Sequence, residues 1–303
     1  ANFVDLDGFI LTNGLSGVDT QWNLAFPPNG TTPSFASYLP AAAQPTPFDY
    51  SCFRCHTTGA LDQDPTNPMF QDNRPGIAGT WHAEGVQCET CHGPGSNHAP
   101  APFLRNNYVN SSAFVCGQCH SSNNDSSTIL ASDGFIDHSQ QWSELRASGG
   151  HKDFSCTYCH DPHVGTSYPP DQGIRNACTA CHTDQNMALH EGKVTRDGVE
   201  TLSCISCHMT CATRTAATAD ASLVGALGRM GDTRTHIFRV ANDPVDFTGF
   251  FSPEGKSVLK DTDGRAAVTV DFVCLRCHNG NRAFMMTVSQ AADKVEGLHR
   301  VFP

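Results

Sequence analysis

The strongest constraint on this chain is a five-residue pattern, Cys-x-x-Cys-His, that occurs seven times in 303 residues. Two cysteines three residues apart share one face of a helical turn, and the histidine follows at once. This is the attachment signature of a c-type haem: both cysteines form thioethers with the porphyrin, and the histidine binds the iron. The sequence therefore predicts seven covalently bound haem c groups.

Alternative explanations of the repeated pattern account for it less well. A disulfide framework does not require a histidine after every second cysteine, and zinc ribbons pair two Cys-x-x-Cys units without that histidine. The predicted attachment cysteines are Cys52, Cys55, Cys88, Cys91, Cys116, Cys119, Cys156, Cys159, Cys178, Cys181, Cys204, Cys207, Cys274 and Cys277. The predicted proximal iron ligands are His56, His92, His120, His160, His182, His208 and His278. The remaining cysteine, Cys211, is either a buried apolar residue or a partner in an intermolecular disulfide.

The chain also has eight histidines outside the motifs, for seven irons that each need a sixth ligand or an open site. These candidate distal ligands are His82, His98, His138, His151, His163, His190, His236 and His299. The count predicts seven bis-histidine haems with one histidine to spare. Methionine is the rival ligand, but Met209 directly follows a proximal histidine, and Met285 lies in an apolar run.

Two of these histidines, His151 and His163, flank the fourth motif. Imidazole–metal bonds are about 2 Å long, so a sixth ligand must approach the iron from the far face of the porphyrin. His163 is only three positions after His160, which is too few for the chain to wrap around that disc. We therefore expect both flanking histidines to bind the irons of other haems.

Composition predicts an irregular fold with a haem-chain core, short α-helices and a few short strands. Seven haems leave about 43 residues for each, only 39% of residues are apolar, and there are 26 glycines and 18 prolines. Residues 1–51, without cysteine or histidine, are expected to form a haem-free strap that lies on its own chain or on another subunit. Residues 52–303 are expected to form the heptahaem domain. Within it, residues 127–148 and 289–299 have helical character, while 236–240 and 268–273 read as strands.

The formal charge of −11 makes nucleic acids and anionic membranes poor partners. No apolar run approaches the roughly 18 residues that span a bilayer. Polar sequence directly follows Ala1, and haem is generally attached to such motifs outside the cytoplasm, so we expect the mature form of an exported protein. The expected location is extracellular or at the cell surface, with the periplasm as the alternative.

Several longer phrases resemble a known group of proteins. They are Trp81-His82 before Cys88-Glu-Thr-Cys-His-Gly-Pro-Gly-Ser-Asn-His98, His151 to His163, His190 to Met209, Gly231-Asp-Thr-Arg-Thr-His236 and Cys274-Leu-Arg-Cys-His-Asn-Gly. Over residues 52–282 they resemble the multihaem superfamily of tetrahaem cytochromes, octahaem tetrathionate reductase and hydroxylamine oxidoreductase. The likeness is greatest to extracellular electron-conduit and nanowire cytochromes. It implies that His82, His98, His151, His163, His190 and His236 are distal haem ligands. Seven haems is not the number in the named relatives.

These features predict an electron-transfer protein and not an enzyme, with redox proteins or extracellular electron acceptors as its partners. Close-packed haems pass electrons between irons whose potentials the protein sets. The haem-free strap and the resemblance also predict a homo-oligomer. A head-to-tail filament is one form that it would take, since contacts that do not close generate filaments. His299 or His82 would then bind the next subunit's iron. The alternative is a reductase or oxidase of small nitrogen or sulfur oxyanions, which requires one open iron.

Overall fold

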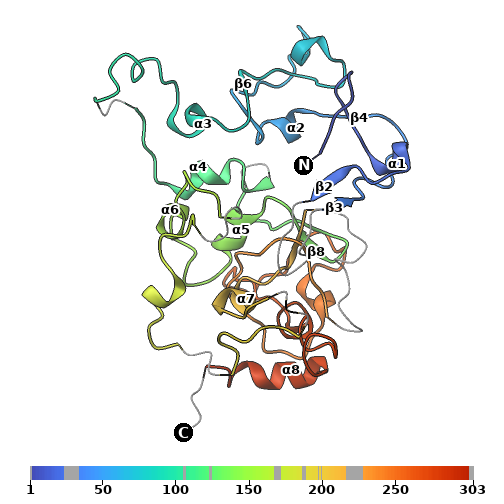
Figure 1. Ribbon diagram of the computed structural model, residues 1–303, viewed down its shortest axis with the longest axis vertical. Coiled ribbons are helices and arrows are strands. Elements are labelled where there is room, and N and C mark those ends of the chain that lie inside the picture. The colour runs from blue at the N-terminus through green and yellow to red at the C-terminus, as the bar shows by residue number, and fades with distance from the viewer. Residues whose placement is uncertain are drawn as a thin grey trace. The chain divides into compact units, whose positions relative to one another are not determined.

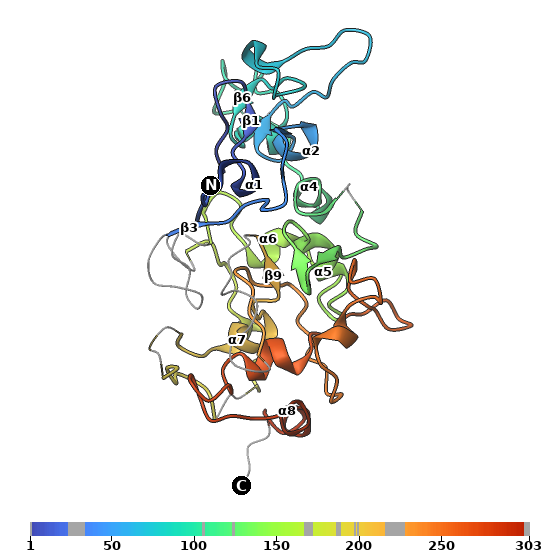
Figure 2. The same cartoon turned by 90° about the vertical axis from the view of Figure 1, so that its right-hand side faces the viewer.

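The computed structural model describes residues 2–23, 34–104, 107–122, 125–166, 172–185, 189–196, 198, 200–215 and 228–299. Short helices and strands alternate there with long irregular segments (Figures 1 and 2). The α-helices are α1 (Asn13–Ser16), α2 (Tyr50–Phe53), α3 (Cys88–His92), α4 (Ala113–Gly117), α5 (Gln141–Arg146), α6 (Cys156–Cys159), α7 (Cys204–His208) and α8 (Val288–Val295). The tighter or wider turns are η1 (Gln71–Asn73), η3 (Cys178–Ala180), η5 (Phe247–Phe250) and the π-helical η6 (Asp271–Leu275). The strands are β1 (Phe9–Ile10), β2 (Gln21–Asn23), β3 (Ser34–Ala36), β4 (Thr46–Pro47), β5 (Thr57–Thr58), β6 (Ala83–Glu84), β7 (Ala131–Ser132), β8 (Phe135–Asp137) and β9 (Thr213–Arg214).

The expected irregular architecture of short helices and few strands is confirmed. Polar side chains set where the helices begin, because they accept hydrogen bonds from otherwise unpaired backbone N–H groups. Asp49 caps α2 by accepting from the N–H of Ser51 at 3.0 Å. Thr287 caps α8 by accepting from the N–H of Gln290, whose side chain accepts in return from Thr287. Of the described helices, none combines the length and the apolar character needed to cross a membrane.

Contacts divide the described residues into two units, one formed by 2–23 with 34–119 and the other by 120–299. The division falls between Cys119 and His120. The N-terminal residues belong to the first unit: β1 pairs antiparallel with β4, and the N–H of Gly76 donates to the carbonyl of Asp7 at 2.8 Å. A side chain at Gly76 would lie 2.4 Å from the backbone of Gly8, so glycine allows this close approach.

Aromatic packing holds the first attachment motif in its unit. Phe53, between the two cysteines of that motif, is fully buried. Its ring centroid lies 5.9 Å from that of Phe48 and 5.2 Å from that of Trp81. Such tilted arrangements stabilise buried rings beyond the area they remove from water. The first motif is thereby fixed on a small rigid cluster.

The second unit has an apolar core next to a three-stranded sheet. Strand β8 pairs antiparallel with β7 and parallel with β9. The buried core residues include Ile129, Phe135, Ile136, Ile237, Phe250, Phe251, Val258, Val268 and Phe272. Helices α7 and α8 both pack against η6, and they lie near each other in both views (Figures 1 and 2). Aromatic and aliphatic side chains therefore form a substantial core in this unit, beyond what composition led us to expect.

The structure corrects three expected elements. Residues 236–240 do not form a strand, because Val240 makes only an isolated bridge there, with Val268. Residues 127–148 are not helical throughout, because β7 and β8 form a hairpin whose turn has positive φ at Asp133 and Gly134 (50° and 76°). Asp-Gly is a favoured pair for such a tight turn, and only α5 is helical in this stretch. The expected strand at 268–273 is also wrong: Val268 forms a single bridge with Val240, and the chain then turns into η6. The expected C-terminal helix is present as α8, which ends before His299.

Candidate haem sites

All seven motifs begin in a helical turn, as the spacing of their cysteines predicts. The first cysteine of each lies in α2, α3, α4, α6, η3, α7 or η6. In the fourth, fifth and seventh motifs the N–H of the histidine donates to the carbonyl of the first cysteine, at 2.8 to 3.0 Å. This turn puts both sulfur atoms on one side with the histidine directly after them. None of the fifteen cysteines, all of which the structure describes, forms a disulfide.

Thiols of successive motifs lie close together in the second unit. Burial raises the pKa of Cys159, with a further contribution from Cys181 of the fifth motif. Burial also raises the pKa of Cys178, and nearby Cys204 of the sixth motif adds to it. The pKa of Cys274 is raised to about 12 by burial and by Cys207 of the sixth motif. The fourth to seventh motifs thus follow one another in space.

The first unit places thiols of the third motif beside those of the first and the second. The thiols of Cys55 and Cys119 hydrogen-bond, which lowers the pKa of Cys55 to about 6 and raises that of Cys119. Burial raises the pKa of Cys91, and Cys116 contributes. The third pair of cysteines therefore lies between the other two.

Four motif histidines of the second unit each face a histidine from outside the motifs. Two iron–nitrogen bonds of about 2 Å plus the two half-rings would separate the ring centroids by about 6 Å. The observed centroid separations are 6.0 Å for His160 and His236, 5.8 Å for His182 and His151, 5.7 Å for His208 and His299, and 6.2 Å for His278 and His190. Each pair therefore has about the ring separation that two histidines would need to hold one haem iron between them.

In several motif histidines, a hydrogen bond fixes which ring nitrogen carries the proton and which has the lone pair that can bind iron. Because a carbonyl oxygen only accepts, Nδ1 facing one must carry the proton, and the lone pair is then on Nε2. His208 Nδ1 donates to the carbonyl of Phe238 at 2.7 Å, and His278 Nδ1 to that of Phe284 at 3.0 Å. His92 Nδ1 donates to Tyr108 at 2.7 Å. In the pair of His208 and His299, the two Nε2 atoms face each other at 3.4 Å.

Burial favours the neutral form of three of these rings, which is the form that a metal needs. Desolvation lowers the pKa of His151, His160 and His190, and the facing histidine of each pair lowers it further. A neutral imidazole retains the lone pair that binds iron, whereas a protonated one does not. The pKa shifts and the ring separations therefore point to the same histidines as iron ligands.

The side chains around the sixth and seventh motifs include residues that sequence reasoning missed. Arg276, between the two cysteines of the seventh motif, is 1% exposed and bonds Glu200 at 2.6 and 3.0 Å. It also donates to the carbonyl of Ser206 in the sixth motif at 2.7 Å. The sequence feature that could have identified Arg276 is its place between the two cysteines of an attachment motif. Cys211 is fully buried nearby, which favours the apolar role over an intermolecular disulfide.

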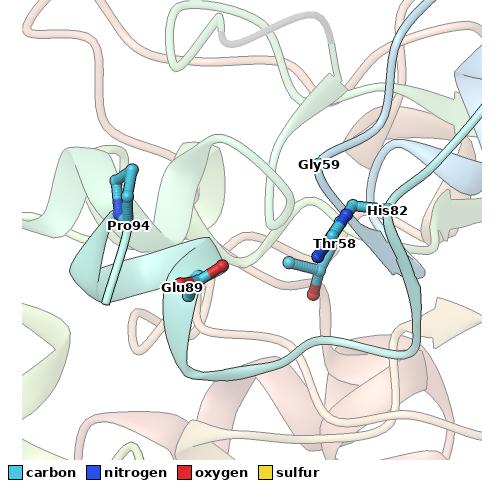
Figure 3. Close-up of a pocket in the computed structure, with 5 residues that line it drawn as sticks. All are labelled: Thr58, Gly59, His82, Glu89 and Pro94. Atoms are coloured by element: carbon cyan, nitrogen blue, oxygen red, sulfur yellow. The ribbon is translucent and has the colours of Figure 1, made fainter. Parts of the chain in front are cut away.

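His82 lies in the first unit beside the second motif. A hollow of about 330 Å³ is lined by Thr58, Gly59, His82, Glu89 and Pro94. Figure 3 shows Thr58 and His82 on one side of it, with Glu89 of α3 on the other. His82 N–H donates to the carbonyl of Thr58 at 2.9 Å, and a side chain at Gly59 would approach the His82 Cβ to 2.9 Å. The backbone thus brings His82 to the rim of this hollow.

Three further histidines predicted as ligands lie in turns. His98 follows α3, and His138 follows β8. His163 follows α6 with its side chain 71% exposed and its Nδ1 3.4 Å from Asp161. His151, at the other flank of the fourth motif, lies beside His182 of the fifth motif.

Comparison with known proteins adds a family likeness for part of the chain. Residues 37–93, which contain the first two motifs, match the family model described as cytochrome c554 and c-prime. No curated protein sequence matches the chain.

Three solved structures resemble the fold at low identity. The octaheme sulfite reductase MccA of Wolinella succinogenes matches 73% of this chain at 19% identity, with a TM-score of 0.43. The outer cell wall cytochrome OcwA matches 88% at 15% identity, with a TM-score of 0.44. The undecaheme cytochrome from the S-layer of Carboxydothermus ferrireducens matches 80% at 14% identity, with a TM-score of 0.38. The chain spans 41%, 66% and 43% of these proteins, respectively.

Proposed function

We propose that this chain, a multihaem c-type cytochrome, transfers electrons along a row of seven covalently bound haems. Its attachment motifs and its match to the cytochrome c554 model support the class. Each bound haem supplies a reversible one-electron change of its iron. The chain's cysteines would anchor the porphyrin edges, and its histidines would hold the irons and exclude other chemistry.

The four histidine pairs of the second unit carry the proposal. Their ring separations of 5.7 to 6.2 Å match two ligands of one iron. The proposed axial pairs are His160 with His236, His182 with His151, His208 with His299, and His278 with His190. Histidine on both faces leaves no position for a substrate at these four irons. The chain is therefore proposed to be a carrier and not an enzyme.

Neighbouring thiols support an order for the row. A thioether joins its sulfur to the porphyrin edge, so motifs with adjacent sulfurs hold haems with adjacent edges. Within the second unit Cys159 lies near Cys181, Cys178 near Cys204, and Cys274 near Cys207, which supports the order fourth, fifth, sixth, seventh. Within the first unit the third haem lies between the first and the second. Electrons would hop along these neighbours.

The proposed location is outside the cytoplasm, at the cell surface or in the periplasm, because haem is generally attached to such motifs there. The proposed partners are redox proteins or extracellular electron acceptors. Protease treatment of intact cells distinguishes the two locations, since only a surface protein would be degraded. A haem-loaded chain recovered only from the cytoplasm would contradict both.

Replacement of His299 with alanine tests the ligand assignment. The sixth haem should lose one axial ligand, so one low-spin ferric centre should become high-spin in the electron paramagnetic resonance (EPR) spectrum, with haem content unchanged. Lys294→Ala, at an exposed position of α8, is the matched control and should leave the spectrum unchanged. A His299→Ala spectrum identical to that of the native protein would contradict the proposed pair.

Reduced protein mixed with sulfite, nitrite or hydroxylamine tests the absence of catalysis. Closed irons should remain reduced over the time in which an external one-electron oxidant reoxidises all of them. Rapid, catalytic reoxidation by one of these compounds would instead support the reductase alternative.

A further inference from the structure

A buried carboxylate, Glu144 of α5, lies beside one of the proposed distal ligands. Its residue is fully buried, and its Oε2 accepts from the backbone N–H of His236 at 2.6 Å. Its Oε1 accepts from the Thr213 hydroxyl at 3.2 Å. The same Oε2 lies 3.7 Å from Nδ1 of the His236 ring. The carboxylate thus faces the ring nitrogen opposite the one proposed to bind iron.

Both groups lack a full set of partners. No lysine or arginine pairs with Glu144 among the described residues, where its only partner within ion-pair distance is His236. The buried Nδ1 of His236 has no hydrogen-bond partner within that same part of the chain. A buried carboxylate is costly unless donors surround it, and a buried N–H is costly unless an acceptor meets it. A movement of under 1 Å would satisfy both groups with one hydrogen bond.

This environment differs from that of the other rings with a known Nδ1 partner. His92, His208 and His278 donate to neutral backbone carbonyls, and His120 Nδ1 lies 3.2 Å from the amide oxygen of Gln141. Another carboxylate near a histidine ring is that of Asp161, which lies 3.4 Å from Nδ1 of His163, whose side chain is 71% exposed. Solvent weakens that interaction, whereas Glu144 acts in a buried setting.

We propose that Glu144 accepts a hydrogen bond from Nδ1–H of His236 and thereby sets the fourth haem as the lowest in potential of the four paired haems. A carboxylate acceptor makes the imidazole a stronger donor and fixes its orientation. A stronger donor stabilises ferric over ferrous iron. Glu144 is a positioning residue that acts through His236. The inference rests on the proposed ligation of the fourth haem by His160 and His236.

Glu144→Gln in the haem-loaded protein tests the inference. The amide keeps the shape and can still accept from Thr213 and from the His236 backbone, but it loses the charge. The reduction potential of one haem should rise by about 59 mV. For one electron this corresponds to about a tenfold higher ferrous-to-ferric ratio at a fixed applied potential. The EPR g-values of one low-spin centre should change with it. Glu254→Gln, which removes the same charge from an exposed turn of the same unit, should leave both unchanged.

A second pair of variants separates the possible failures. If His236→Ala yields one high-spin haem while Glu144→Gln leaves every potential unchanged, the role of Glu144 is refuted and the ligation stands. If His236→Ala leaves all haems low-spin, the proposed ligation itself is refuted. Should Glu144→Gln not fold, Glu144→Asp keeps the charge but withdraws it from the ring. Glu144→Asp should raise the reduction potential of the same haem by a smaller amount. An unchanged potential would overturn the inference.

Discussion

Replacement of Arg276 with methionine should destabilise the second unit strongly. The guanidinium bonds Glu200 at 2.6 and 3.0 Å and the carbonyl of Ser206 at 2.7 Å, and the two charged side chains are 1% and 5% exposed. Burial alone would raise the pKa of Glu200, but the hydrogen bonds and charge of Arg276 outweigh burial and hold that pKa below its usual value. The pair joins the sixth motif to the seventh.

The magnitude follows from what the substitution leaves behind. Removal of one partner of a buried ion pair costs about 3–5 kcal/mol, because the other charge stays buried and uncompensated. Arg234 lies 3.4 Å from Glu200 and is 18% exposed, so it compensates part of that charge. We therefore expect a loss of about 3 kcal/mol in the free energy of unfolding, measured by chemical denaturation followed by far-ultraviolet circular dichroism.

Two further variants make this prediction decisive. Arg146→Met breaks an exposed pair with Asp153, at 45% and 71% exposure, and should cost no more than about 1 kcal/mol. The double variant Arg276→Met with Glu200→Leu removes both buried charges and should recover much of the lost stability. If Arg276→Met costs no more than the Arg146 control, then Arg276 and Glu200 do not hold the two motifs together.

Two other predictions concern cofactor content and assembly. The intact mass should correspond to seven haems, and Cys204→Ser with Cys207→Ser should lower the number to six, whereas Cys211→Ser should keep seven because it lies outside the motifs. A native mass that corresponds to six or fewer would contradict the assignment of every motif. The head-to-tail filament stays a prediction: electron microscopy should show polymers of native protein, and a monomer at every concentration would exclude them. His299 already faces His208 of its own chain, so the exposed His82 is the better candidate for an inter-subunit ligand.

The attachment sites could be predicted from the sequence because each is local. Five consecutive residues bring two sulfurs and one imidazole to the same turn, and this needs no tertiary information. All seven first cysteines lie in the expected helical turns. The irregular fold could be predicted from composition because this signal is also local. Frequent capping residues and glycines limit the length of helices.

The distal partners could not be predicted, because they depend on how distant segments pack. His208 and His299 are 91 residues apart in the chain, and no spacing rule connects them. Counting histidines predicted histidine as the sixth ligand but could not assign one to an iron. Glu144 gave no signal either, since a single glutamate in an amphipathic helix ordinarily faces solvent.

The strand expected at 268–273 failed because alternating β-branched residues also suit a buried turn. Val268, Val270, Asp271 and Phe272 are all buried, whichever way they point. Asp271 accepts hydrogen bonds from Thr269 and from the N–H of Phe247, which stabilises the start of η6. The turn also carries Cys274, so the seventh attachment site determines the backbone there.

The EPR spectrum of the fully oxidised native protein tests the central claim most directly. If histidine occupies both axial positions of every iron, the ferric haems should all be low-spin, and no high-spin signal should appear. The spectrum should also stay unchanged when cyanide or azide is added, because no iron has an open position. A high-spin ferric signal equivalent to one or more haems per chain, lost on addition of such a ligand, would contradict a closed electron-transfer row.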